Sequence, residues 1–390
     1  MAYQTKQQTA IDAKIERAMG VIDGFINHHE ICQSNEWKKN WLLPAVMPIK
    51  PNGEPYRAGN FITLYLAGYG DERFFTYKNA IDMDTYIKKG EKGKPITFAE
   101  IRKKKEINPA TGQEEEIEYP VVKKYTVFNA QQLADLEKVD KVRPPIERKP
   151  FSSEMQIEQN EYFSALMMVA DEMGIMIDHQ KQDKAYYSPT ADKIVMPPME
   201  SFQDYISYAG TLMHEMAHAT GHKDRLNRLS VEKGKFGDEA YAIEEITAEC
   251  TSLMLSARTG LKYDTSQHEN HLAYLHSWGN RLKGIDEKSK KPPEEIKKEA
   301  AKMIMGAVSN AQKAFDYINE KVEAKLVQLQ EKERTMSFSD TLSKEEKLEI
   351  IDTNEINLKN EARQVMQDKL AVAMNEAPTN DARSSSSMSR

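Results

Sequence analysis

The chain has few cysteines and no long apolar run. Cys32 and Cys250 are the only two cysteines among 390 residues, which excludes the disulfide framework of a small secreted domain and fits a reducing cytoplasm. No apolar run approaches the roughly 18–20 residues of a membrane-spanning helix. Residues 1–19 also lack the apolar core of a signal peptide. We therefore expect a cytoplasmic protein with no membrane partner.

The chain also lacks an excess of positive charge. It contains 54 Lys and Arg residues against 61 Asp and Glu, a net charge of −7, and an acidic chain taken as a whole argues against a nucleic-acid partner. The charge is unevenly distributed, however. Residues 1–150 contain 24 basic and 21 acidic residues (+3), and residues 151–390 contain 30 and 40 (−10). The whole-chain sum therefore does not decide whether the first part binds nucleic acid.

The sign of the charge changes at residues 141–150, a charged stretch with three prolines that is typical of a linker. Before it, apolar residues at helical spacing predict a helix over 6–33. Segments 96–107 and 114–129 flank a loop suited to a β-hairpin. We expect an α+β domain over 1–140, hereafter the first region, and a linker over 141–152.

The chain after the linker is mostly helical in pattern. A helix is predicted over about 155–173, and a strand–turn–strand unit joins 186–187 to 194–196. Long charged helices are predicted over 267–284, 294–332 and 343–375, with breaks at 292–293 and 337–343. We expect a second domain over 153–330 (the second region), a helical extension over 331–376 and a disordered, serine-rich tail over 377–390.

Residues 214–222 read HEMAHATGH and carry the clearest chemistry. His214 and His218 are four residues apart on a predicted helix, so their imidazoles project from one face about one turn apart. Two neutral imidazoles in this arrangement can bind one zinc ion, although another divalent metal is possible. Glu215 lies beside that face and can act as the general base of hydrolysis. Chance supplies only about 0.02 such patterns in a chain of this composition.

A catalytic zinc ion needs a third protein ligand. The downstream segment EEITAE, residues 244–249, has a helical pattern that places Glu245 and Glu249 on one face. Glu245 is the preferred ligand, with Glu249 orienting a ligand histidine. Asp224, His222 and Glu249 itself are the alternative ligands.

These motifs resemble those of the ArdC-type antirestriction proteins of plasmids and phages. In the second region the matching sequence segments are YYSP (186–189), IVMPP (194–198), HEMAHATGH, FGDEAYA (236–242) and EEITAE. In the first region they are YRAGN (56–60), GEKGKP (90–95) and VFN (127–129). The resemblance covers residues 10–325 and implies an α+β fold, with an N-terminal α+β domain that binds single-stranded DNA followed by a zincin-like metallopeptidase domain. It carries the metal and general-base roles over to His214, Glu215, His218 and Glu245.

The first region combines a modest positive charge with many aromatic residues, as binding of single strands requires. The candidate rings and cations for this binding are Trp37, Lys38, Lys39, Trp41, Tyr56, Arg57, Lys89, Lys92 and Lys94. The basic run 102–105 is a weaker candidate, because acidic residues 114–118 are expected across the hairpin and would neutralise it. The strand at 193–197 has two possible roles, pairing with an extended peptide substrate or a place in the core.

Three functions are compatible with these residues. The first is a zinc metallopeptidase of a plasmid or phage that binds single-stranded DNA, cleaves an unidentified protein substrate and protects incoming DNA from host restriction. The second is a non-proteolytic protein that shields single-stranded DNA, with a structural or vestigial metal site. The third is a zinc peptidase that acts independently of DNA. Hydrolysis follows from the HExxH spacing, whereas DNA protection follows from the resemblance alone.

Overall fold

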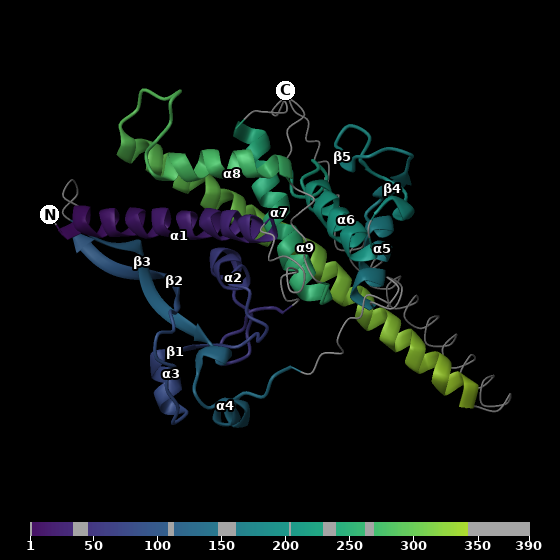
Figure 1. Cartoon of the computed structure of the whole chain (residues 1–390), viewed down its shortest axis with the longest axis horizontal. Coiled ribbons are helices and arrows are strands. Elements are labelled where there is room, and N and C mark those ends of the chain that lie inside the picture. The colour runs from purple at the N-terminus through teal and green to yellow at the C-terminus, as the bar shows by residue number, and fades with distance from the viewer. Residues whose placement is uncertain are drawn as a thin grey trace, which may run out of the picture. The chain divides into compact units, whose positions relative to one another are not determined.

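The first region contains a long helix and a three-stranded antiparallel sheet in the computed structural model (Figure 1). The structure describes residues 2–33, 46–107, 113–146, 161–202, 204–228, 239–261 and 269–341. The elements of the first region are α1 (Ala2–Gln33), α2 (Ala58–Tyr65), β1 (Phe74–Thr76), α3 (Tyr77–Asp82), β2 (Lys94–Ile107), β3 (Glu114–Asn129), η1 (Ala130–Gln132) and α4 (Leu136–Val142). The predicted helix and hairpin are both confirmed.

The hairpin of β2 and β3 forms an extended arm, with strand order β1-β3-β2 in its sheet. The basic run 102–105 lies in β2 and pairs in register with residues 116–119 of β3. Lys103 contacts Glu116 at 2.8 Å and Lys105 contacts Glu114 at 3.2 Å. The predicted cross-strand neutralisation is therefore confirmed for these two lysines.

The second region packs helices around a small mixed sheet. Its elements are α5 (Glu161–Glu172), β4 (Met176–His179), β5 (Tyr186–Ser188), β6 (Lys193–Met196), η3 (Met199–Ser201), α6 (Tyr205–Ala219), α7 (Glu239–Thr259), α8 (Glu269–Leu282) and α9 (Pro293–Thr341). The strand order is β4-β6-β5, with β6 parallel to β4 and antiparallel to β5. The predicted strand–turn–strand unit is confirmed.

The structure decides between the two roles left open for the strand at 193–197 and corrects part of one predicted helix break. β6 has a strand on each side, so its hydrogen-bonding edges are occupied and it cannot pair with an extended peptide substrate. The predicted helix break over 337–343 is wrong for residues 337–341, because α9 runs on to Thr341, and residues 342–343 lie outside the described residues. Serine and phenylalanine lower helix propensity only slightly, so the Ser-Phe-Ser stretch does not end the helix. The predicted helix over 343–375 and the tail lie outside the described residues.

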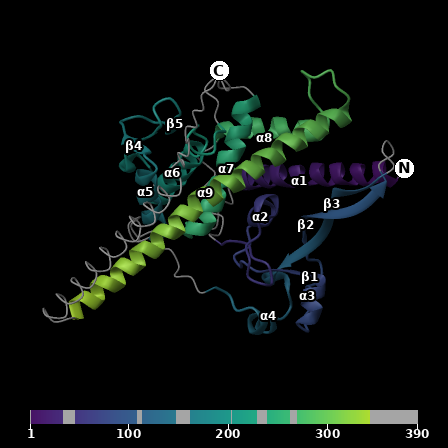
Figure 2. The same ribbon diagram turned by 180° about the vertical axis from the view of Figure 1, so that it is seen from behind.

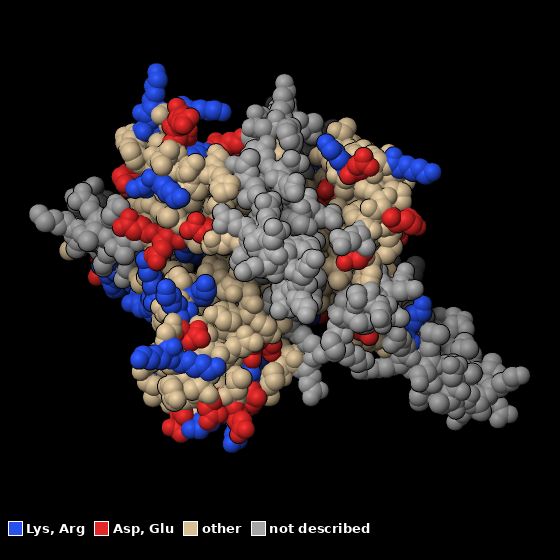
Figure 3. All heavy atoms as spheres, in the orientation of Figure 1, with Lys and Arg blue, Asp and Glu red and all other residues tan. Residues whose placement is uncertain are grey.

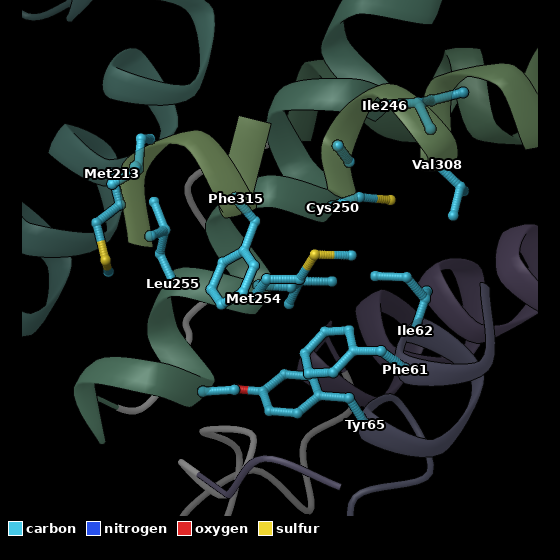
Figure 4. Close-up of a cluster of buried hydrophobic side chains, with 14 of the residues drawn as sticks. Phe61, Ile62, Tyr65, Met213, Ile246, Cys250, Met254, Leu255, Val308 and Phe315 are labelled. Carbon is cyan, nitrogen blue, oxygen red and sulfur yellow. The ribbon is translucent and has the colours of Figure 1, made fainter. Parts of the chain in front are cut away.

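One hydrophobic core joins the two regions. It contains residues of α1 and α2 together with residues of α5, α6, α7 and α9. Figure 4 shows Phe61, Ile62 and Tyr65 of α2 pointing toward Met254 of α7 and Phe315 of α9. Phe61 and Tyr65 are almost fully buried, and their rings stack at 5.1 Å. The α+β first region therefore packs directly on the helices of the second.

Two further contacts tie the regions together. Helix α1 lies beside α8 in both views (Figures 1 and 2). At the start of α2, the backbone N–H of Ala58 donates to the side chain of Gln312 in α9 at 2.6 Å, and Arg57 forms an ion pair with Asp316. Both regions accordingly belong to one compact unit, Met1–Leu326, and its boundary with Val327–Arg390 falls inside α9. Among the described helices, none combines the length and apolarity that crossing a bilayer requires.

Candidate metal centre

Helix α6 presents the two histidines of the HExxH motif to α7. The helix begins at Asp204, whose carboxylate accepts a hydrogen bond from the N–H of Ser207 at 2.8 Å and caps the free end. Leu212, Met213 and Met216 are buried in the core and hold the helix in place. His214 and His218 project from the side that meets α7, which packs along α6.

Three side chains converge where α6 meets α7. The Nε2 atoms of His214 and His218 lie 3.2 Å apart. Carboxylate oxygens of Glu245 lie 3.4 Å from Nε2 of His214 and 3.7 Å from Nε2 of His218. All three ligand atoms fall within 4.8 Å of one another. Two bonds of about 2.0–2.1 Å that meet at a tetrahedral angle end about 3.3–3.4 Å apart, so these separations fit donors around one small cation.

Each histidine also meets a carboxylate on its other nitrogen. Glu249 lies 3.4 Å from Nδ1 of His214, and Glu244 lies 3.4 Å from Nδ1 of His218. Arg228 donates to Glu244 at 2.9 Å and to the carbonyl of Ala217 at 2.9 Å. A carboxylate on Nδ1 fixes the imidazole tautomer and leaves Nε2 directed at the metal position. Glu249 was expected in this role from the sequence.

Sequence reasoning missed Glu244 and Arg228. Glu244 is adjacent to Glu245 on α7, and neighbouring positions on a helix point about 100° apart, so spacing alone does not assign both to one site. Glu244 contacts Nδ1 of His218, whereas Glu245 contacts the Nε2 atoms of both histidines. The two neighbouring glutamates can therefore both contact His218, because they meet different nitrogens of its ring. Arg228 lies beyond the HExxH helix in a loop, and no spacing rule links it to Glu244.

The carboxylates set the protonation of the site. Burial lowers the pKa of His214, but the hydrogen bonds and charges of Glu245 and Glu249 outweigh it and raise that pKa well above its usual value. Burial likewise lowers the pKa of His218, and Glu244 and Glu245 raise it overall. Burial raises the pKa of Glu244, whereas hydrogen bonds from His218 and Arg228 lower it overall. The carboxylates around the two imidazoles thus favour positive charge at this position.

Glu215 lies in the same buried environment. The residue is 7% exposed, and its charge contributes to raising the pKa of both His214 and His218. The carboxylate is therefore within electrostatic reach of both imidazoles. This placement agrees with a general base beside the donor group.

Of the alternative ligands, Glu249 lies beside Nδ1 of His214, and His222 and Asp224 lie outside the donor group. The Nδ1 atom of His222 faces Asp224 at 3.5 Å and Asp192 at 3.8 Å. The Asp224 side chain is 74% exposed. Neither belongs to the donor group of His214, His218 and Glu245.

A second network of hydrogen bonds, formed by Arg225, Asp192 and Tyr187, connects segments next to this site. Arg225 donates to Asp192 at 3.1 Å, and Tyr187 donates to Asp192 at 2.6 Å. Arg225 also donates to the hydroxyl of Tyr187 at 3.0 Å. The hydroxyl proton of Tyr187 is therefore directed at Asp192. The network joins the β5–β6 turn to the loop that follows α6.

The predicted DNA-binding residues have varied positions. Trp37, Lys38, Lys39 and Trp41 lie outside the described residues. Tyr56 is 4% exposed and packs edge-on against Phe74, so its ring is not available to stack on a base. Arg57 is an exposed residue, but its guanidinium is paired with Asp316. Lys89 and Lys92 are exposed, and Lys94 is half-buried at the start of β2.

Two known protein families match the chain, one in the first region and one in the second. Residues 20–128 match the N-terminal domain of the anti-restriction factor ArdC, and residues 164–290 match the zincin-like metallopeptidase family MPTase-PolyVal. The metal-free crystal structure of the antirestriction ArdC protein from plasmid R388 is 32% identical, with a TM-score of 0.53 over 79% of this chain and 98% of that one. The Mn(II)-bound structure of that protein is 30% identical, with a TM-score of 0.50 over 78% of this chain and 97% of that one.

Curated relatives extend the comparison. A DNA primase TraC of Escherichia coli is 34% identical over 62% of this chain, which spans only 23% of the primase. The uncharacterized protein y4eC of Sinorhizobium fredii (strain NBRC 101917 / NGR234) is 33% identical over 60% of this chain and 72% of its own length. The two family matches and the coverage of ArdC confirm the α+β fold and the resemblance stated above. The chain belongs to the ArdC-type antirestriction family, with an ArdC N-terminal domain and a zincin-like metallopeptidase domain.

Proposed function

We propose that this chain is a metallopeptidase that binds single-stranded DNA and protects incoming mobile DNA from host restriction. The observation that carries the peptidase part is the convergence of His214, His218 and Glu245 within 4.8 Å, with Glu215 buried beside them. The family match of residues 20–128 supports the DNA-binding part. The relatives support a setting in mobile DNA, since the ArdC structures come from plasmid R388.

The donor set favours zinc as the bound ion. Two imidazoles and one carboxylate are the protein ligands of a typical catalytic zinc site, which keeps one position open. Glu245 is the third ligand in this proposal, because it contacts both Nε2 atoms while Asp224 and His222 lie outside the group. The Mn(II)-bound ArdC structure supports a divalent ion in general.

A divalent ion held here would supply Lewis-acid chemistry, polarising a peptide carbonyl and lowering the pKa of water. The protein's own groups do the rest. Glu244 and Glu249 orient the imidazoles of His218 and His214 through their Nδ1 atoms. The carboxylate of Glu215 accepts a proton from the attacking water and then delivers it to the nitrogen of the leaving amine. Arg228 keeps Glu244 ionised and in position.

The test compares Glu215→Gln with wild type and with Glu200→Gln, which changes an exposed carboxylate shortly before α6. We expect Glu215→Gln to keep its metal and its melting temperature while losing hydrolysis, followed as self-cleavage in the presence of single-stranded DNA. Glu200→Gln should cleave like wild type. Hydrolysis that persists in Glu215→Gln would contradict the mechanism.

The shielding function is tested with the same variant in cells. The transfer efficiency of unmodified DNA into a restricting host is measured with wild type and with Glu215→Gln. Loss of protection in the variant supports a role for proteolysis. Full protection would instead favour shielding of the strand, with the metal site structural or vestigial.

A further inference from the structure

Two aromatic rings are exposed side by side on the β2–β3 hairpin. Phe98 is 38% exposed and Tyr125 is 42% exposed. Their ring centroids lie 5.7 Å apart at an angle of 72°. By contrast, Tyr56, Phe61 and Phe74 of the same region are buried in the core. Phe98 and Tyr125 thus present apolar rings to solvent on a rigid sheet.

The strand register places basic residues on the same face as these rings. Phe98 lies opposite Lys123, and Ile96 lies opposite Tyr125. Directly paired residues share a face, and side chains two positions along a strand share it too. Lys94, Phe98, Arg102, Lys123 and Tyr125 therefore lie on one side of the sheet, which we term the hairpin face. Ile96 and Val127 share this side but are buried in the core, so the exposed rings of the face begin at Phe98 and Tyr125.

The lysines on the other side of the hairpin are held in ion pairs. Lys124, next to Lys123 in sequence, points to the opposite face and forms an ion pair with Glu16 of α1. Lys103 and Lys105 also lie on that opposite face, where Glu116 and Glu114 pair with them. The basic run 102–105 is thus split, and Arg102 belongs to the hairpin face.

The hairpin face carries three cations against one carboxylate between Lys94 and Arg102. Glu100 forms ion pairs with Lys123 at 2.8 Å and with Arg102 at 3.2 Å, so its one negative charge is shared between two of the three cations and the face keeps an excess of positive charge. In Figure 3, Lys and Arg atoms gather over the part of the molecule where Figure 1 draws β2 and β3. At about 3.4 Å per residue, Lys94 and Arg102 lie about 27 Å apart along β2, with the rings between them.

We propose that the hairpin face binds single-stranded DNA, with bases stacked on Phe98 and Tyr125 and phosphates beside Lys94, Lys123 and Arg102. The inference rests on the DNA-binding part of the proposed function and assigns a surface to it. Exposed rings flanked by cations are the features that single-strand binding uses, since every base has an aromatic face and every nucleotide a charge. If Phe98 and Tyr125 served only to stabilise the hairpin, the ring pair would be sufficient and the neighbouring cations would not be needed.

The stacking part is tested in the full chain with the double variant Phe98→Leu/Tyr125→Leu. Binding is measured by fluorescence anisotropy with a labelled 15-nucleotide oligo(dT) and with an abasic oligonucleotide of the same length and charge. We expect the double variant to bind oligo(dT) roughly tenfold more weakly and the abasic strand unchanged. Tyr125→Phe should bind both like wild type.

The matched control is Tyr86→Leu, which removes a 67% exposed ring from the same region outside the hairpin. It should leave oligo(dT) binding unchanged. An equal loss in Tyr86→Leu would overturn the assignment of the site to the hairpin face. Melting curves of each variant exclude unfolding as the cause.

The charge part is tested with Lys123→Gln. This variant should weaken oligo(dT) and abasic binding equally and reduce the slope of log K against log salt by about 0.7, the value for one phosphate contact on a single strand. If wild type binds neither strand at micromolar protein, the DNA-binding part of the proposed function fails, and this inference fails with it. If wild type binds and the double variant binds oligo(dT) equally well, the inference alone is overturned, and the face serves another partner.

Discussion

Glu244 lies 3.4 Å from Nδ1 of His218, on the side of the ring opposite the metal position. Its carboxylate is itself held by the guanidinium of Arg228, so a line of three side chains runs from the loop after α6 to the candidate ligand. The orientation of the candidate ligand His218 therefore depends on Glu244 and Arg228, which lie outside the donor group.

The first prediction concerns Glu244→Gln. The amide loses the charge that holds the His218 tautomer, so metal affinity should fall about 10- to 100-fold, measured by competition with a chromogenic chelator. Glu239→Gln removes an ion pair with Arg281 from the same helix and should leave the affinity unchanged. An affinity in Glu244→Gln equal to wild type would show that Glu244 does not support the site.

The second prediction concerns the metal content of His218→Ala. Removal of one of two imidazoles should leave the purified variant with little metal by elemental analysis, because two protein ligands retain an ion poorly. His276→Ala, at an exposed position of α8, should retain the wild-type content. Undiminished metal in His218→Ala would contradict the site.

The third prediction is a pH dependence of stability at Asp192. Burial raises the pKa of Asp192, but hydrogen bonds from Arg225 and Tyr187 outweigh it, so the pKa lies below the ordinary value of 3.8. The folded state thus prefers the carboxylate. Its stabilisation is present at pH values above the unfolded pKa and is lost as the pH falls below about 4 through the folded pKa.

Asp192→Asn should therefore lower the free energy of unfolding at pH 7 by about 1–3 kcal/mol, because Arg225 loses a charged partner. The difference from wild type should shrink as the pH falls below about 4, followed by urea denaturation across that range. Asp183→Asn, at an exposed loop position nearby, should show no such difference. A constant gap at all pH values would contradict the assigned cause.

The fourth prediction concerns cooperativity of unfolding. Because one core includes α2 of the first region and α7 of the second, Phe61→Ala should destabilise the protein by about 3–5 kcal/mol. Calorimetry should show a single transition that moves down as a whole. Two transitions, with only one of them shifted, would mean that the two regions unfold independently.

The sequence predicts the parts of this molecule that depend on local periodicity. His214 and His218 share a face because four residues make about one helical turn, and Glu245 and Glu249 share one for the same reason. The hairpin is predictable because the segments 96–107 and 114–129 flank a loop sequence suited to a β-hairpin. Each of these relationships lies within a single element or across one tight loop.

Relationships set by packing between distant segments are not predictable in this way. The apolar stripe of α2 shows that the helix is buried but not that it is buried against α7 and α9. The pairing of Arg57 with Asp316 joins residues 259 positions apart, and nothing in the sequence marks the partner. Tyr56 lies in a motif that suggested DNA contact, yet the same apolar core takes up its ring.

Helix α7 carries Glu244, Glu245 and Glu249 toward the histidines and presents Met254 to α2 of the first region. Helix α7 thus contributes both to the candidate metal centre and to the packing of the first region on the second. The two regions are therefore not interchangeable modules. A chimera that joins this first region to the peptidase of a distant relative would place foreign side chains against Phe61 and Ile62. We therefore expect relatives that exchange these regions to keep the packing behind Glu245 and Glu249 best where α2 and α7 are inherited together.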